Sequence, residues 1–351
     1  MKNYKLLLFI ALLISCSDES SILYNKIDID IIDLDKNNNV LSFNNSKNIF
    51  EYVNYKSNPK FNFSTDMRES TFNFVSFRDV YLKALEELDL AKTLEEHNDI
   101  LDKYSDIITI TDDSYVPTIS RLTFQLICNR KGLYGSKNYI HRVIDDKFVV
   151  MGEKQYINEI IQINSIDEID LNKFSLVNFV GQNLKSNSNS RVENHCGIFD
   201  ANGGNFINKY VDNSASNCKD KRRATGHMHA FFTPMSTIQG VNYTPTVEVS
   251  VLGLRQKWLN CKWQNYNTAL EARAGNFTVE VTINGNSNIY TGSWGYYYSA
   301  LDEEKAVLFS NAVGPSVTLS GSKTIYFNGG NTNLEISSRG VGDNWAIINC
   351  H

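Results

Sequence analysis

A series of short segments in which apolar and polar residues alternate is the feature that most constrains the fold of this chain. Val247, Val249 and Val251 fall on one face of such a segment, and residues 277–283 repeat the pattern before Asn284-Gly285, a dipeptide typical of tight hairpins. Residues 324–327, 334–336 and 346–348 extend the series. Many short strands separated by Gly and Asn turns predict a sandwich- or barrel-like β domain of about 150 residues.

Two amphipathic helices are predicted ahead of this domain, over residues 76–90 and 93–105. Ser76 with Asp79, and Thr93 with Glu96, have the spacing of capping boxes, in which each side chain accepts a hydrogen bond from the other residue's backbone N–H. His97 falls on or beside the apolar face of the second helix. We therefore interpret His97 as a structural histidine rather than a ligand.

Short apolar runs broken by turn residues follow the helices, and we expect strands at residues 122–128, 132–135, 139–144 and 148–151. The turn Asn-x-x-Gly-x-Tyr occurs at residues 129–134. A helix pair followed by a hairpin module with this turn resembles the N-terminal region of surface lipoproteins of the Bacteroidota. The resemblance covers residues 76–165, and it implies lineage and location rather than an activity.

The N-terminal part suggests two strands, over residues 27–34 and 40–43, with a turn at residues 36–39. The same stretch superficially matches a calcium-binding loop, but Asn38 replaces the glycine of the sharp turn and Asn44 replaces the bidentate carboxylate, so we favour a plain hairpin.

The predicted helices and strands together give the fold class α+β. The expected divisions are a signal peptide (1–15), a tether with N-terminal strands (16–75), a helix-pair and hairpin module (76–181), a polar linker (182–191) and a β-sandwich-like domain (192–351).

The first residues have the layout of a bacterial secretion signal, with Lys2 and Lys5 ahead of an apolar run at residues 6–14. That run is about half of the ~20 residues that a membrane-spanning helix needs. The motif Leu13-Ile14-Ser15-Cys16 resembles the lipobox, which implies cleavage before Cys16 and lipidation of its thiol. Multiple acyl chains would anchor the mature chain stably, at ~0.8 kcal/mol per buried methylene.

The tetrapeptide Ser17-Asp18-Glu19-Ser20 resembles the acidic tag that directs Bacteroidota lipoproteins to the cell surface. The alternative is a flexible tether on a lipoprotein that faces the periplasm.

The formal net charge is -5, and the basic residues are scattered apart from one short cluster at residues 219–223. Nucleic-acid binding requires a larger basic patch, so no nucleic-acid partner is expected.

Five cysteines remain after Cys16, an odd number for an oxidising compartment. We predict that Cys128, at the end of an apolar run, is a buried free thiol. The candidate disulfide cysteines are Cys196 with Cys218 and Cys261 with Cys350, although spacing alone does not fix the pairing. A metal site is the alternative for these cysteines, but none forms a closely spaced pair.

His227 and His229 are the sharpest chemical feature, because alternation along a strand would place both imidazoles on one face. Such a pair could chelate a metal if a third ligand came from elsewhere. The alternative is that one imidazole packs beneath Phe231 and the other is solvated. No zinc-protease motif, nucleophile elbow or nucleotide-binding glycine loop is present in the sequence. No catalytic residue and no cofactor are therefore assigned.

All four tryptophans lie in the strand-rich half, together with three consecutive tyrosines. Rigid rings with a polar tip suit protein interfaces and stacking on sugars, whereas a second covered face of the sandwich would explain them equally well. The candidate ligand-binding residues are Trp258, Trp263, Trp294, Tyr296, Tyr297 and Tyr298. The fourth tryptophan is Trp345.

These features together predict a surface lipoprotein of the outer membrane, held through its lipid anchor, that binds a glycan or a protein without catalysis. One alternative is a metal-dependent hydrolase that uses His227 and His229. Another is a structural subunit of the envelope or of an assembly within it.

Overall fold

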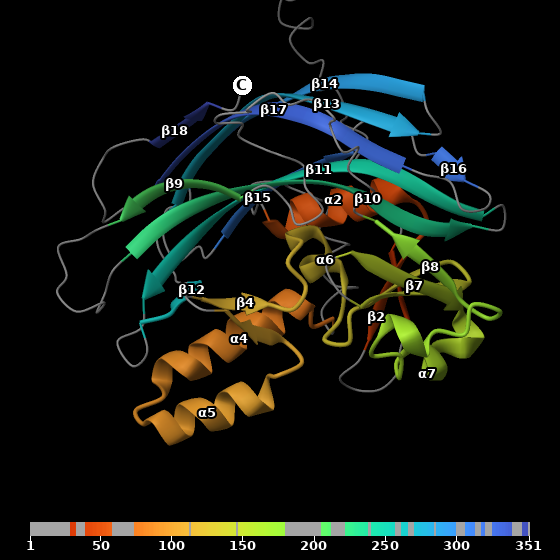
Figure 1. Cartoon of the computed structure of the whole chain (residues 1–351), viewed down its shortest axis with the longest axis horizontal. Coiled ribbons are helices and arrows are strands. Elements are labelled where there is room, and N and C mark those ends of the chain that lie inside the picture. Colours follow the sequence, from red (N-terminus) through yellow and green to blue (C-terminus); the bar gives the residue numbers. More distant parts are fainter. Residues whose placement is uncertain are drawn as a thin grey trace, which may run out of the picture.

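The computed structural model describes residues 29–32, 39–57, 74–111, 114–144, 147–179, 205–211, 222–237, 240–256, 261–265, 270–283, 286–299, 306–312, 317–319, 325–338 and 346–349. The fold is α+β, with helices in the N-terminal half and a strand-rich C-terminal half, as predicted (Figure 1). In the described part of the chain, no helix is both long and apolar enough to cross a membrane.

Five α-helices are labelled in Figure 1, and two 3-10 turns accompany α7 in the sequence. Their bounds are α2 Ser46–Ser57, α4 Phe77–Leu90, α5 Leu94–Lys103, α6 Leu122–Ile127, α7 Ile157–Ile160, η1 Lys154–Tyr156 and η2 Ile166–Glu168. The helix pair α4 and α5 was predicted, and both capping boxes are formed. Helix α2 was not predicted.

The first sheet has the strand order β1-β2-β5-β6-β7-β8, with β2 and β5 parallel and the other neighbours antiparallel. Its strands are β1 Ile29–Ile32, β2 Val40–Phe43, β5 Leu133–Ser136, β6 Tyr139–Val143, β7 Phe148–Glu153 and β8 Ser175–Asn178. A separate two-stranded sheet pairs β3 Ile108–Ile110 with β4 Tyr115–Pro117. The predicted strands over residues 27–34, 40–43, 132–135, 139–144 and 148–151 are therefore confirmed.

Two long sheets form the C-terminal half. One has the order β12-β11-β10-β9, with β15 and β16 also paired to β11, and the other has the order β14-β13-β17-β18. The strands are β9 Asn205–Val211, β10 Arg222–Thr237, β11 Gly240–Gln256, β12 Trp263–Asn265, β13 Leu270–Ile283, β14 Asn286–Ser299, β15 Ala306–Ala312, β16 Val317–Leu319, β17 Ile325–Ser338 and β18 Ala346–Asn349. The two sheets lie against each other in Figure 1, with β17 next to β10 and β13 next to β11.

The predicted hairpin at residues 284–285 agrees with the register, because Ile283 at the end of β13 is paired with Asn286 at the start of β14. Residues 324–327 and 334–336 were expected as separate strands, but they belong to the single strand β17. Gly292 on β14 lies over the ring of Phe277, where an added Cβ would come within 2.4 Å of the ring carbon Cζ. This close approach explains why β14 carries a glycine there.

One prediction is wrong: residues 122–128 were expected to form a strand, and residues 122–127 form the helix α6. The run is apolar at most positions and almost wholly buried, so it shows neither the alternation of a half-exposed strand nor the one-sided stripe of a surface helix. Cys128, directly after α6, is the predicted buried free thiol.

The main hydrophobic core is shared between the helices, the first sheet and β10. Phe124 of α6 lies 4.9 Å from Phe179 and 5.5 Å from Phe231 of β10, measured between ring centroids. Tyr81 and Leu85 of α4 and Met235 of β10 belong to the same cluster. A second cluster, which includes Ile160 of α7, covers the opposite face of the first sheet. Residues before and after the predicted linker therefore pack into one core.

Candidate functional site

A buried polar junction joins helix α6 to the strands of the C-terminal half. The guanidinium of Arg121, which is the N-cap residue of α6, is almost fully buried and places Nη1 2.8 Å from Nδ1 of His229 on β10. Arginine only donates hydrogen bonds, so Nδ1 of His229 accepts this one. One of the two histidines singled out in the sequence is therefore bound to an arginine inside the protein.

Glu248 on β11 is the cross-strand partner of His229 and completes the junction. Its carboxylate accepts hydrogen bonds from the backbone N–H groups of Leu122 and Thr123, at 3.0 and 2.7 Å. Burial raises the pKa of Glu248, while these hydrogen bonds and the charge of Arg121 oppose that rise. The first backbone N–H groups of a helix have no acceptor within the helix. In α6 two of them are bound by a side chain of strand β11.

The hydroxyl of Thr123 extends the junction to a third strand, because its Oγ1 lies 3.2 Å from Oγ of Ser310 on β15. The junction therefore fixes α6 against β10, β11 and β15 at once. Among the described residues no group of three His, Cys, Asp or Glu side chains is placed to hold a metal ion. The side chain of His227 lies outside the described residues, and a metal at this histidine pair stays a prediction.

A second buried polar contact joins the first sheet to the end of β10. Ser236 donates its backbone N–H to Nε2 of His141 at 3.0 Å, and Tyr134 donates its hydroxyl to the carbonyl of Pro234 at 2.8 Å. The rings of Tyr134 and His141 stack, with centroids 4.5 Å apart. Burial lowers the pKa of His141 to about 3, so this imidazole is neutral at physiological pH.

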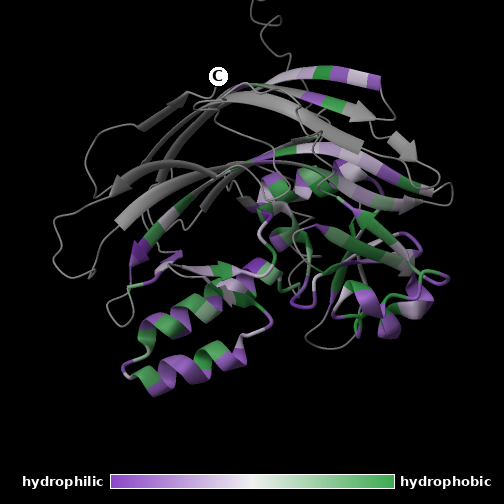
Figure 2. Cartoon of the chain, viewed as in Figure 1, coloured by the Kyte–Doolittle hydropathy of each residue, from purple (hydrophilic) through white to green (hydrophobic). Residues whose placement is uncertain are grey.

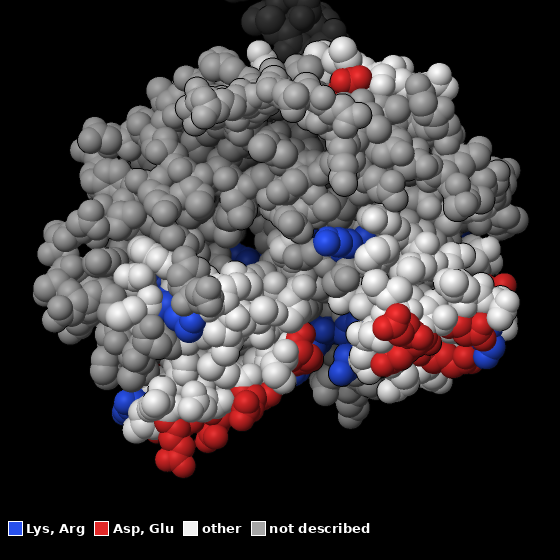
Figure 3. Space-filling model, viewed as in Figure 1, with Lys and Arg blue, Asp and Glu red and all other residues white. Residues whose placement is uncertain are grey.

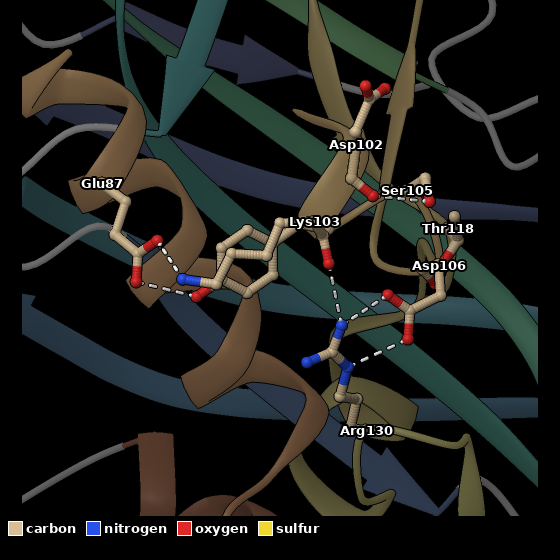
Figure 4. A network of polar contacts seen from close by, with 8 residues as sticks. Glu87, Asp102, Lys103, Ser105, Asp106, Thr118 and Arg130 are labelled. Atoms are coloured by element: carbon tan, nitrogen blue, oxygen red, sulfur yellow. Dashed lines mark hydrogen bonds and ion pairs between the residues drawn. The ribbon is translucent and has the colours of Figure 1, made fainter. Parts of the chain in front are cut away.

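Polar contacts also hold the helix pair α4–α5 in one orientation (Figure 4). Glu87 of α4 accepts hydrogen bonds from Nζ of Lys103, at 2.6 Å, and from the hydroxyl of Tyr104, at 2.9 Å. Arg130 binds the carboxylate of Asp106 through two nitrogens and the carbonyl of Lys103 through one of them. The end of α5 is thus attached both to α4 and to the turn that precedes β5.

Helix α4 is in turn attached to the sheet of the C-terminal half. Asp89 forms an ion pair with Arg255 at 2.9 Å and accepts a hydrogen bond from Gln264 on β12. The hydroxyl of Tyr81 lies 3.2 Å from Oδ1 of Asn265 on the same strand. His97 of α5 is buried and lies 3.0 Å from the hydroxyl of Tyr115, which confirms that it is a structural histidine.

An open groove of about 500 Å³ lies between the end of α4 and the start of α5. It is lined by Glu87, Leu90, Ala91, Lys92, Glu96, Asp99 and Ile100. The side chain of Leu90 is 78% exposed and that of Leu94, at the first position of α5, is 60% exposed. Leu94 is not among the lining residues, so the groove combines one strongly exposed leucine, Leu90, with carboxylates on a helix pair whose position is fixed.

Hydrogen bonds favour the charged form of two carboxylates in this groove. The backbone N–H groups of Lys92 and Thr93 lower the pKa of Glu96, and the hydrogen bond from Lys103 lowers the pKa of Glu87. Figure 3 shows acidic side chains gathered over the α5 end of the molecule and again over the α7 end. Figure 2 shows that α5 is mostly hydrophilic on the surface seen there.

The predicted aromatic binding residues are only partly within the described chain. Trp258 and Trp345 lie outside it, and for Trp294 and the tyrosines at 296–298 the backbone of β14 is described but the side chains are not. Tyr296 and Tyr298 pair with Ala274 and Ala272 of β13, and Tyr297 pairs with Arg273 between them. Trp263 is 7% exposed, which leaves little of its ring for a ligand.

Of the candidate disulfide cysteines, Cys196, Cys218 and Cys350 lie outside the described residues. Cys261 is exposed at a backbone φ of 58° and is disulfide-bonded. The predicted pairing of Cys261 with Cys350 stays a prediction. Cys16 and the acidic tag also lie outside the described residues.

Comparisons with known proteins add little to these observations. No family model matches the sequence, and no curated protein matches it. Among solved structures, the chain is similar to a crystal structure of a DUF4848 family protein from Bacteroides thetaiotaomicron, with 15% identity and a TM-score of 0.27, over 91% of this chain and 98% of that one.

The sequence alone could not reveal the junction or the groove. Arg121, His229 and Glu248 are far apart along the chain, and only His229 belongs to a pattern that the sequence analysis singled out. The groove had one detectable signal, since Leu90 and Leu94 stand beside the connection between two well-predicted helices. Leucines at the end of one helix and the start of the next are often buried in a helix pair, so their exposure required the structure.

Proposed function

We propose that this protein is a lipid-anchored lipoprotein of the outer membrane that binds a macromolecular partner at the cell surface without catalysis. The observation that carries the proposal is the groove between α4 and α5, where Leu90 is 78% exposed. Leu90 offers an apolar contact to a partner, next to the half-buried Ile100, in a groove on a helix pair whose position is fixed. The membrane anchor in this proposal rests on the lipobox residues 13–16.

The rigidity of the helix pair supports a binding role. Two capping boxes fix the starts of α4 and α5, and the contacts of Glu87, Asp89 and Arg130 fix their orientation. A surface that is ordered before binding loses less conformational entropy when a partner docks. The groove is therefore better suited to recognition than a mobile loop of the same composition would be.

The buried histidine and glutamate support a binding role over metal-dependent hydrolysis. The Nδ1 lone pair of His229 accepts a hydrogen bond from the Arg121 guanidinium at 2.8 Å. A metal ion at that nitrogen would have to displace a cationic side chain and then remain beside it. Glu248 in turn has its carboxylate engaged by two backbone N–H groups of α6. These side chains hold elements together.

Site-specific photocrosslinking in the native host tests the proposal. A photoreactive amino acid replaces Leu90 in the groove or, as a matched control, Leu171, which is 69% exposed and also has acidic neighbours. We expect a discrete adduct from position 90, identifiable by mass spectrometry as one protein, and none from position 171. A ladder of glycan adducts at position 90 would support binding but change the partner class. No adduct, or equal adducts at both positions, would contradict the proposal.

A further inference from the structure

The helix pair contains an excess of acidic residues. Between Phe77 and Lys103 the sequence has twice as many acidic as basic residues, whereas over the whole chain the two classes are nearly balanced, at 39 and 34. Figure 3 shows the acidic side chains on the surface at this end of the molecule. A concentration of one sign of charge around an apolar groove attracts a partner of the opposite sign.

Carboxylates also outnumber the single lysine among the residues that line the groove itself. Glu87 is bound to Lys103 and Tyr104, and Glu96 caps α5, so both are fixed in place. Asp99 is exposed and stands one helical turn beyond Glu95 and Glu96. The rim thus contains fixed negative charge as well as a solvated carboxylate, with Leu90 and Ile100 between them.

We propose that the groove binds a cationic protein segment, in which an apolar side chain docks beside Leu90 and Ile100 while flanking lysine or arginine side chains face Glu96 and Asp99. This deepens the proposed function and rests on it. The charge of the rim selects the partner, because an acidic segment would meet the carboxylates of Glu96 and Asp99 on α5. Apolar contact supplies affinity, and the opposite charges supply orientation and speed of association.

A second copy of the chain is a less suitable occupant. One further region with exposed leucine and isoleucine, around Leu171 and η2, is itself acidic, with Glu159, Asp167 and Glu168 exposed. Docking that region of one copy into the groove of another would bring like charges together. An anionic lipid surface is disfavoured by the same repulsion.

Fluorescence anisotropy with designed peptides tests the partner class, using the lipid-free form Cys16→Ser of the full mature chain. The probe is a labelled 13-residue peptide with Leu at two central positions and Lys or Arg at the flanks. One control peptide has its leucines changed to serine, and a second has its basic residues changed to glutamate. We expect saturable binding of the first peptide alone, weakened several-fold between about 0.05 and 0.5 M salt, because added salt screens exposed charges.

Variants locate the site. Leu90→Ser is expected to weaken binding about tenfold, from the loss of one buried leucine contact, and Asp99→Asn about two- to fivefold, from the loss of one exposed charge. Asp102→Asn removes the same charge from the same helix outside the groove, and Leu171→Ser removes an exposed leucine elsewhere. Both control variants are expected to bind the peptide as the parent form does. All four variants are expected to have the circular dichroism spectrum of the parent form.

Equal binding of the glutamate peptide, or equal effects of Asp99→Asn and Asp102→Asn, would overturn the cationic-segment proposal. Peptide-independent dimerisation that Leu90→Ser abolishes would also overturn it, in favour of a second copy. These failures are distinguishable from failure of the proposed function. A discrete crosslink at position 90 to a partner segment without basic residues leaves the binding function standing, whereas the absence of any crosslink removes both.

Discussion

At the scale of single residues, the groups that resemble catalytic side chains are engaged in joining parts of the fold. Arg121, His229 and Glu248 come from one helix terminus and two strands, and they meet in an interior where each is buried. Removing one partner from such a set leaves charge or hydrogen-bonding groups unsatisfied in a low dielectric, which is more destabilising than the intact set is stabilising.

Glu248 provides the sharpest test of this interpretation. We expect Glu248→Ala to lower the free energy of unfolding by about 3–5 kcal/mol, because two backbone N–H groups of α6 and the Arg121 charge lose their partner. Glu248→Gln retains one acceptor oxygen and should lose roughly 1–2 kcal/mol. Urea unfolding of the Cys16→Ser form measures both. Glu280→Gln on β13, which is only half-buried, serves as the control, and an equal loss there would contradict a special role for Glu248.

His141 makes stability depend on pH. Burial lowers its pKa to about 3, against 6.5 for an exposed histidine, so the unfolded chain binds a proton below pH 6.5 that the folded chain excludes until about pH 3. Its contribution is therefore fully present above pH 6.5 and is lost as pH falls, at about 1.4 kcal/mol per pH unit.

The measurement is urea unfolding between pH 7 and pH 4.5. His141→Gln should remove this part of the pH dependence, so that its disadvantage relative to the parent form shrinks as the solution is acidified. Ser236→Ala is the control, because it removes a hydroxyl near His141 but keeps the imidazole. Parallel pH curves for the parent form and His141→Gln would show that another group is responsible.

At the scale of elements, sequence reasoning succeeded where the signals were local. Helices α4 and α5 were found because their capping residues lie within four positions of one another and their apolar stripes have helical spacing. The strands of the C-terminal half were found from their alternation. Helix α6 was missed because it is buried on nearly every side, and α2 because it contains β-branched and aromatic residues and has no acidic residue in its first turn.

The capping box of α4 leads to a prediction about that helix. The hydroxyl of Ser76 accepts from the N–H of Asp79 at 3.1 Å, and the Asp79 carboxylate accepts from the N–H of Ser76 at 2.9 Å. Ser76→Ala should lower the free energy of unfolding by about 1 kcal/mol. Ser165 precedes the turn η2 without a side-chain cap, so Ser165→Ala should change stability by well under half that amount. Equal losses in the two variants would contradict the role of the cap.

At the scale of the whole molecule, the chain combines a shared core with a charged helix pair at one end. Tyr81 and Phe124 from the N-terminal half and Phe231 and Met235 from the C-terminal half lie in one cluster. The boundaries predicted from the polar stretch at residues 182–191 stay a prediction, because that stretch lies outside the described residues. Long-range packing of this kind leaves no mark in a single sequence.

The shared core predicts cooperative unfolding. Far-ultraviolet circular dichroism follows helix and strand content throughout the chain, whereas tryptophan fluorescence follows only the C-terminal half, where all four tryptophans lie. We expect the two signals to change at the same urea concentration, because neither half keeps a complete core alone. Two separated transitions would indicate that the halves fold independently.

In the proposed function, the helix pair is displayed outside the cell, where a partner can reach its groove. Brief trypsin treatment of intact cells of the native host, followed by mass spectrometry, tests this claim most directly, because Lys92 is exposed in the connection between α4 and α5. We predict release of peptides ending at Lys92 while a periplasmic marker protein stays intact. Protection of the chain until the outer membrane is ruptured would contradict surface display and would place the protein on the periplasmic side.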